Sequence, residues 1–213
     1  MYDTNTQSTA LSPMVRALAA LIAVMALASL AAQFIASQTL HPEENTFATL
    51  WRLGRFFTIL TNSLVVVTFA VLVVRAQVLS PVWLGGVTLW IAIVGVVYHL
   101  LLAATDSQET TIGWWANFGV HTSVPIAVVL WWLAFAPRNG LSVTSALMWM
   151  IWPMIYVSYA LLRGQTDGVY PYFFTNPTEI GWDGVIIWTA ILAGFFFVAG
   201  LLQIALARLI RQT

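Results

Sequence analysis

The sequence predicts an all-α fold, a polytopic membrane bundle of six transmembrane helices that forms a single domain over residues 1–213. The first observation behind this prediction is composition: 60% of the residues are hydrophobic and only 8% are charged, whereas soluble globular domains carry about 25% charged residues. The second is that the apolar residues gather in six stretches. Each stretch can cross ~30 Å of hydrocarbon, which takes about 20 residues. The third is that most of the connecting loops are short.

The expected spans cover residues 14–35, 53–74, 82–104, 114–135, 141–162 and 185–206. The first could instead be a secretory signal, but its apolar run is longer than the roughly 7 to 15 residues of a signal core. Two loops are long, around residues 39–50 and 163–184. The second of these is strongly aromatic, so we expect it to fold over the mouth of the bundle, the alternative being a belt of aromatic side chains at the membrane interface.

The basic residues, all arginines, predict the orientation. With six spans, both termini share one side of the membrane with the second and fourth loops. That side carries five arginines, Arg16, Arg75, Arg138, Arg208 and Arg211, and the other carries three, Arg52, Arg55 and Arg163. Because cytoplasmic loops are enriched in basic residues, we expect the N and C termini in the cytoplasm.

Composition also excludes several classes of function. A net charge of zero and the lack of a basic cluster argue against nucleic-acid binding. Without cysteine, the chain has no disulfide, thiol nucleophile or thiolate metal ligand. His41 stands beside Glu43 and Glu44, but in a loop, so no pair of ligands at i, i+3 or i, i+4 on a helix supports a metal site. We therefore expect no metal and no cofactor; the sequence leaves the oligomeric state open.

A polar stripe at the start of the second span is the clearest candidate for a functional site. On one continuous helix, Trp51, Arg55, Thr58 and Asn62 would fall within about 60° of each other. Polar side chains in hydrocarbon are costly unless they pair or face a cavity. The alternatives are that Thr58 bonds to its own helix backbone or glues helices together, and that Arg55 extends to the interface.

Two histidines on other spans are expected at nearly the same depth in the membrane as this stripe. Thr58 follows Trp51 by seven residues and His121 follows Trp114 by seven, so each would lie about 10 Å below its end of the membrane at 1.5 Å per residue. His99 would lie at about 8 Å by the same arithmetic. For His99 the alternative, a packing residue beside Tyr98, is the stronger interpretation.

Local sequence around His121 favours a cavity. Pro125 cannot donate the backbone hydrogen bond that the His121 carbonyl would accept, so the helix should be irregular there. Asn117 lies one turn before His121 on the same face. An imidazole both accepts and donates protons near neutral pH.

Three short motifs resemble one known family. The motifs are Phe57-Thr58-x-x-Thr61-Asn62, His121-x-x-x-Pro125 and Val169-Tyr170-Pro171-Tyr172-Phe173. Their order, together with the six spans, resembles the landmarks of the androgen-induced (AIG/ADTRP-type) membrane protein family and its bacterial relatives. The characterised animal members hydrolyse fatty acid esters of hydroxy fatty acids with an intramembrane threonine nucleophile and a histidine. Animal members tend to carry Asp or Asn three residues after the nucleophile, where this chain has Thr61 followed by Asn62.

The resemblance implies that Thr58 is the nucleophile and His121 its base in a lipid ester hydrolase of a bacterial inner membrane. Oxyanion donors or substrate-binding groups would come from Asn62, Asn117 and Arg55, with His99 and Tyr170 as further candidates. The expected partners are a fatty acyl ester and membrane lipids. The alternative is a small transporter or a lipid-binding membrane protein without catalysis. The apolar inner half of the second span, residues 65–72, disfavours transport because a transport pathway needs polar groups on both halves.

Overall fold

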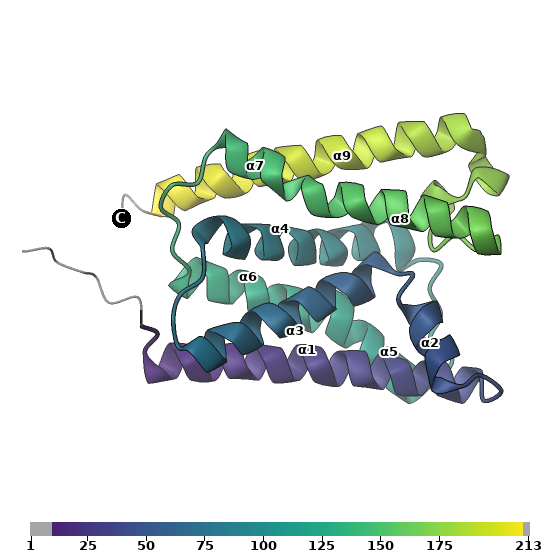
Figure 1. The fold of residues 1–213 in the computed structure, drawn as a ribbon, viewed down its shortest axis with the longest axis horizontal. Helices are drawn as coiled ribbons and strands as arrows, with labels where there is room; N and C mark the ends of the chain where they lie inside the picture. Colours follow the sequence, from purple (N-terminus) through teal and green to yellow (C-terminus); the bar gives the residue numbers. More distant parts are fainter. Residues whose placement is uncertain (1–9, 211–213) are drawn as a thin grey trace, which may run out of the picture.

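A computed structural model describes residues 10–210 and gives a helical bundle (Figure 1). Its helices of more than 15 residues are α1 (Pro13–Leu40), α3 (Phe57–Arg75), α4 (Pro81–Val97), α8 (Ile151–Asp167) and α9 (Pro177–Ile210). The shorter elements are α2 (Thr46–Leu53), the π-helical turn η1 (Tyr98–Leu102), α5 (Thr111–Phe118), the π-helical turn η2 (Gly119–Ser123), α6 (Val124–Phe135), α7 (Val143–Trp149) and the 3₁₀ turn η3 (Phe173–Thr175).

The predicted fold class is confirmed. Six stretches of helix are long and apolar enough to cross a membrane: Pro13–Leu40, Phe57–Arg75, Pro81–Leu102, Thr111–Phe135, Val143–Asp167 and Pro177–Ile210. In Figure 1, the start of α1 and the end of α9 lie at one end of the bundle, and α2 lies at the other. We call the latter the α2 end. Arg52, Arg55 and Arg163 belong to the α2 end, whereas Arg211 lies outside the described residues.

The second span differs from its prediction, because the helix is interrupted rather than continuous from residue 53. α2 ends at Leu53, and Phe56 adopts an extended conformation (φ −92°, ψ 132°) as the N-cap of α3. Trp51 is therefore on a separate helix from Thr58, and the expected single face from Trp51 to Asn62 is wrong. The interruption places Thr58 in the first turn of α3.

Prolines account for two further irregularities. The fourth span is broken into α5 and α6 by η2, directly before Pro125, which agrees with the expected disturbance at His121. The fifth is divided into α7 and α8 around Met150. Pro153 has no N–H to offer the Trp149 carbonyl, and the indole N–H of Trp90 bonds to that carbonyl instead, at 2.8 Å.

The long loop predicted at residues 163–184 is shorter in the structure, because α8 continues to Asp167 and α9 begins with a short helical segment at Pro177. α9 is kinked at Gly181 (φ 70°, ψ 166°), where the backbone is not helical. Arg163 bonds to the Trp51 carbonyl and to the Tyr159 hydroxyl, so hydrogen bonds anchor this part of α8. The intervening residues fold over the bundle, as expected, since Tyr172, Phe174 and Thr175 line a cavity between its helices.

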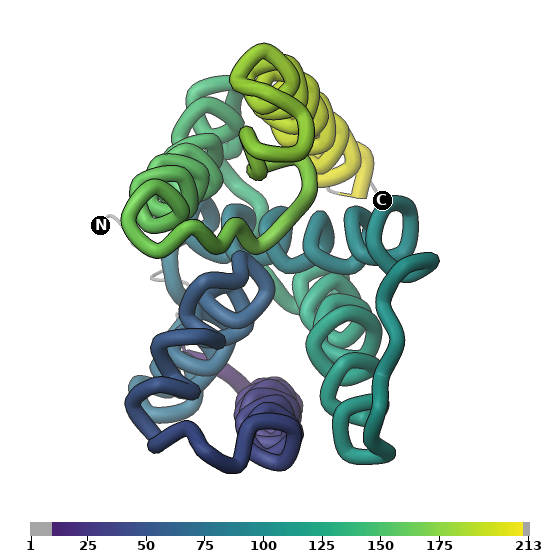
Figure 2. The backbone as a smooth tube through the Cα atoms, turned by 90° about the vertical axis from the view of Figure 1, so that its right-hand side faces the viewer, coloured from purple at the N-terminus to yellow at the C-terminus, as the bar shows by residue number. Residues whose placement is uncertain are grey.

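α4 forms the centre of the bundle. Figure 2 shows it crossing the middle of the molecule, with α8 and α9 on one side and α1, α3 and α6 on the other. Gly85 and Gly86 on α4 let the Trp149 ring approach the α4 backbone. The ring is almost fully buried and its N–H bonds to the Val82 carbonyl at 2.7 Å. Glycine is thus required here for close packing.

Gly85→Ala is expected to lower the free energy of unfolding by about 1 to 3 kcal/mol, the usual range for overpacking a core. A Cβ at residue 85 would lie 2.5 Å from Cζ2 of Trp149, and the hydrogen bond holds that ring in place. Gly194→Ala is the matched control, because a Cβ there meets nothing within 4 Å. Thermal unfolding in detergent checks this, and equal melting temperatures for the two variants would contradict it.

Candidate functional site

Thr58 begins the site. Phe56 is the N-cap of α3, so Thr58 is the second residue of that helix, and only 8% of its surface is exposed. The preceding residues are fixed by α8: the hydroxyl of Tyr156 donates to the Arg55 carbonyl at 2.9 Å, and that of Tyr159 donates to the Gly54 carbonyl at 3.0 Å. The start of α3, where backbone N–H groups lack helical partners and carry partial positive charge, is therefore held in place by a neighbouring helix.

His121 lies directly against Thr58, a contact that the matched depths allowed but could not establish, because they do not determine which helix faces meet. Thr58 Oγ1 is 3.1 Å from His121 Nε2. The other ring nitrogen, Nδ1, is 2.6 Å from Asn117 Oδ1 and 3.2 Å from the Asn117 carbonyl oxygen. Both neighbours of Nδ1 are acceptors, which assigns the proton to Nδ1 and leaves the Nε2 lone pair facing the threonine hydroxyl. In this tautomer His121 can accept the Thr58 proton.

A chain of hydrogen bonds extends from Asn117 to Asp106. The Asn117 amide Nδ2 donates to the Tyr98 hydroxyl at 2.5 Å, and that hydroxyl donates to Asp106 Oδ2 at 2.9 Å. The Tyr98 ring also stacks on the His121 imidazole, with centroids 3.9 Å apart and planes 13° apart. These contacts fix the rotation of the imidazole. They come from the two π-helical turns and their flanks, and π-helical turns are frequent at functional sites.

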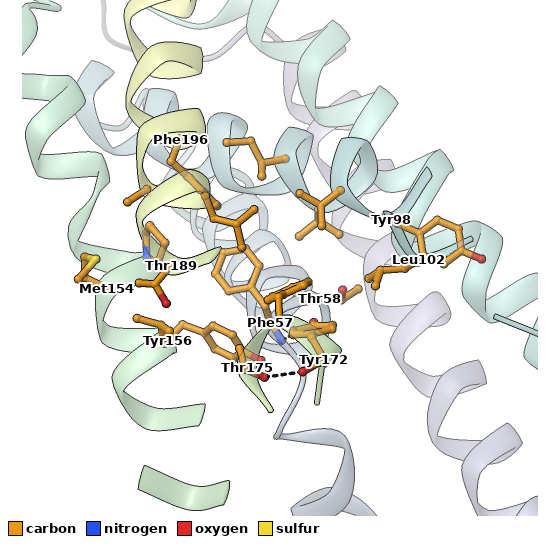
Figure 3. Close-up of a pocket in the computed structure, with 18 of the residues that line it drawn as sticks. Phe57, Thr58, Tyr98, Leu102, Met154, Tyr156, Tyr172, Thr175, Thr189 and Phe196 are labelled. Carbon is orange, nitrogen blue, oxygen red and sulfur yellow. Dashed lines mark hydrogen bonds between the residues drawn. The ribbon is translucent and has the colours of Figure 1, made fainter. Parts of the chain in front are cut away.

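Tyr172 is the residue that sequence analysis missed. Its hydroxyl accepts the backbone N–H of Phe57 at 3.1 Å and interacts with both the side chain and the backbone N–H of Thr58. Figure 3 shows Tyr172 beside Thr58 at the wall of the cavity. Burial raises the pKa of Tyr172 above its ordinary value of 10.0, more than its hydrogen bonds lower it. The phenol therefore keeps its proton, and can donate it, throughout the neutral and mildly alkaline range.

The sequence motif at residues 169–173 lies at the site, but the tyrosine predicted from it was Tyr170, whereas the one beside Thr58 is Tyr172. Tyr170 lies against Gly164, where an added Cβ would be 2.2 Å from its ring, so its role there is packing of the loop on α8. The sequence offered no signal to choose between the two tyrosines, because both lie in a loop that has no helical periodicity.

Three other predicted residues are occupied elsewhere. Asn62 is fully buried and its amide donates to the carbonyls of Thr58 (2.8 Å) and Val120 (3.2 Å), which ties α3 to η2. Arg55 donates to Asp167 and to the Val169 carbonyl, both at 2.9 Å. His99 lies 3.1 Å from the Thr122 hydroxyl. None of these three is among the residues that line the two cavities beside Thr58.

Two cavities of different character meet at Thr58. The first is almost entirely apolar, with about 780 Å³ of empty space including its open side, and lies between α4, α8 and α9. The second encloses about 830 Å³ on the same measure and carries polar groups from Asn117, His121, Asp106 and Gln108. Thr58, Tyr98, Leu102 and Tyr172 line both. A substrate at Thr58 could thus place an apolar part in one cavity and a polar part, or water, in the other.

One further group has the composition of a metal site. The side chains of His41, Glu43 and Glu44 lie within 4.8 Å of one another. Glu44 is already paired with Arg52 at 3.0 Å, and the group is separate from the residues that line the cavities beside Thr58. It has no connection to the chemistry of the Thr58 site.

Comparisons of the chain with models of protein families, with curated proteins and with solved structures found no match. The class of protein is therefore defined by its own fold and site: a helical bundle with six helices suited to a membrane, containing a buried threonine in contact with an oriented histidine.

Proposed function

We propose that this protein is an intramembrane hydrolase of lipid esters, with Thr58 as nucleophile and His121 as general base. The observation that carries the proposal is the 3.1 Å contact between Thr58 Oγ1 and the unprotonated nitrogen of a histidine whose other nitrogen is held by Asn117. A hydroxyl is a weak nucleophile until an adjacent base removes its proton, and a third group commonly orients that base. The motif resemblance to the androgen-induced family supports the same reaction.

The proposed reaction consists of two successive acyl transfers, first to Thr58 and then to water. His121 Nε2 takes the Thr58 proton as Oγ1 attacks the ester carbonyl carbon, and then donates that proton to the departing alkoxide, which leaves an acyl-threonine. Water then attacks the acyl carbon and gives its proton to His121, and Thr58 recovers the proton when the carboxylic acid leaves. The polar cavity on the His121 side supplies a place for that water.

The carbonyl oxygen gains negative charge in both steps, and donors are needed near it. The best-placed group is the Tyr172 hydroxyl, which accepts from the backbone N–H groups at the start of α3 and keeps its own proton to donate. Helix N-termini stabilise negative charge. Asn62 and Arg55 are less suitable, because their side chains already bond to other groups.

Tyr172→Phe is expected to lower kcat for ester hydrolysis by about 10²- to 10³-fold, the effect of removing one oxyanion donor, with little change in KM. Tyr170→Phe makes the same chemical change two residues earlier, where the ring packs against Gly164, and should leave kcat unchanged. Steady-state hydrolysis by the two variants checks this. A Tyr172→Phe rate within about twofold of the natural protein would contradict the oxyanion role, since it corresponds to less than about 0.5 kcal/mol.

The proposed cellular setting is a bacterial inner membrane with both termini in the cytoplasm, supported by the motif resemblance and by the excess of arginines on the terminal side. In this orientation the α2 end, with Thr58, lies toward the outer leaflet.

Lipid-binding without catalysis is the second candidate, because the apolar cavity alone would accommodate an acyl chain. A hydrolysis assay distinguishes the lipid-binding candidate from the hydrolase. Purified protein in liposomes is given lipid esters of several chain lengths, and released fatty acid is measured. The hydrolase proposal predicts multiple turnovers by the natural protein. The control variant Thr122→Ala should give the same number of turnovers, because it alters a threonine that lies at the same 3.1 Å distance from a different histidine. If fatty acid were released from every ester no faster than in empty liposomes, the hydrolase proposal would be overturned.

A further inference from the structure

The apolar cavity has its polar groups at one end. Its deeper walls are formed by apolar side chains, Ile93, Val94, Met150, Pro153, Leu192, Ala193 and Phe196. At the other end lie Thr58 and Tyr172 (Figure 3). Four other hydroxyls are on the wall: Tyr156 donates to the Arg55 carbonyl, Thr175 to the Tyr172 carbonyl and Tyr98 to Asp106, and the fourth is that of Thr189. The reactive hydroxyl thus stands at one end of a chamber whose walls are mostly apolar.

The cavity runs along the bundle axis. Its lining extends over ten residues of the α4–η1 segment, from Ile93 to Leu102, and over eight residues of α9, from Thr189 to Phe196, which are nine and seven residue steps. At 1.5 Å per residue these correspond to about 13 Å and about 10 Å. One leaflet of a bilayer core is about 15 Å thick. The chamber therefore has most of the length of a leaflet and the direction of the lipid chains outside.

The cavity also reaches the side of the bundle between α8 and α9. α9 packs against α4, α7 and η3, whereas its contacts with α8 are few among the described residues. Met154 on α8 and Thr189 on α9 both line the cavity, and Figure 3 draws them on the same side of it. Met154 lines the cavity and is nevertheless 45% exposed, so that wall extends to the surface that hydrocarbon would cover. Gly194, the neighbour of Ala193, has open space around it.

We propose that one acyl chain of a lipid in the surrounding bilayer enters sideways between α8 and α9, and lies along α4 with its ester carbonyl at Thr58. The inference rests on the proposed function for the identity of Thr58, and it adds the route and the class of substrate: an ester already dissolved in the membrane, rather than one taken from water. An acyl chain fits because the chamber is apolar and parallel to the lipid chains. Lateral access also spares the chain from crossing water, which would cost free energy for each exposed methylene group.

The test uses a fatty acid with a photoactivatable diazirine near its methyl end, added to the full chain in nanodiscs. All variants carry Thr58→Ala, so that labelling does not depend on turnover. Crosslinks are expected on the cavity-facing residues of α8 and α9, within residues 150–157 and 189–196. Ala193→Trp, which fills the chamber, should reduce this labelling about tenfold, since losing the burial of about two methylene groups weakens binding by that factor.

Ala190→Trp is the control on α9, because Ala190 is exposed and is not among the cavity-lining residues. Met154→Trp and Ile155→Trp form a second pair on α8, where Met154 lines the cavity and Ile155 does not; it keeps the test valid if Ala193→Trp fails to fold. Labelling that is unchanged by Ala193→Trp and Met154→Trp would overturn the access route. That result would leave hydrolysis by Thr58 standing, whereas cavity labelling of the variants together with no ester hydrolysis by the natural protein would overturn the hydrolase proposal alone.

Discussion

Replacing Thr58 with alanine is expected to abolish lipid-ester hydrolysis, with a loss on the order of 10³- to 10⁶-fold as for other nucleophile deletions. The physical reason is that no other hydroxyl on the described cavity walls lies within hydrogen-bonding distance of His121 Nε2. Thr58→Ser keeps Oγ at the start of α3 and should retain measurable activity. Release of fatty acid from a radiolabelled or fluorescent ester measures both.

The control for this prediction is Thr122→Ala, which removes a threonine hydroxyl next to His99 but outside both cavities. Its rate should match that of the natural protein. If Thr58→Ala and Thr122→Ala were equally active, the nucleophile would have to be sought elsewhere. A circular dichroism spectrum and a melting curve for each variant separate loss of chemistry from loss of fold.

His121→Gln is expected to cause the second-largest loss, about 10² to 10⁴-fold, the usual contribution of a general acid–base group. Glutamine is similar in size, so the stack on Tyr98 and the space beside Asn117 are largely filled. It cannot accept and return a proton near neutral pH. The decrease should appear in kcat, with KM nearly constant, because Thr58 and both cavities remain in place.

Asn117→Ala should fall between the natural protein and His121→Gln in the same assay. Asn117 does not touch the reacting atoms, but it accepts the Nδ1 proton and thereby directs the unprotonated Nε2 to Thr58. An Asn117→Ala rate equal to that of the natural protein would show that the imidazole is oriented by other contacts, such as the Tyr98 ring.

Hydropathy alone predicted the six spans, because a membrane-spanning helix must be apolar over its length and the loops of this chain are short. It could not predict where those helices break. The separation of α2 from α3 depends on Tyr156 and Tyr159 bonding to carbonyls over a hundred residues away in sequence. The division at Met150 depends likewise on Trp90 satisfying a carbonyl that Pro153 leaves free.

The sequence predicted a common depth for Thr58 and His121, because two helices running in the same direction bring equal depths to one level, but it did not predict that the two side chains are adjacent. The depth of Thr58 was nevertheless calculated from Trp51 as if one helix joined them, and the structure shows a break between the two. Which side chains of neighbouring helices face each other could not be calculated, since the order of helices around the bundle is a tertiary property. Asn62 illustrates this: it shares a helix face with Thr58, yet its amide bonds to backbone carbonyls.

The most direct test of the central claim is to identify the residue that reacts with a lipid-like fluorophosphonate. The purified protein is treated with the probe in nanodiscs, digested and analysed by mass spectrometry. The proposed mechanism predicts one phosphonyl adduct on Thr58, absent in Thr58→Ala and much slower to form in His121→Gln. An adduct on another serine, threonine or tyrosine, with Thr58 unmodified and hydrolysis inhibited, would contradict it.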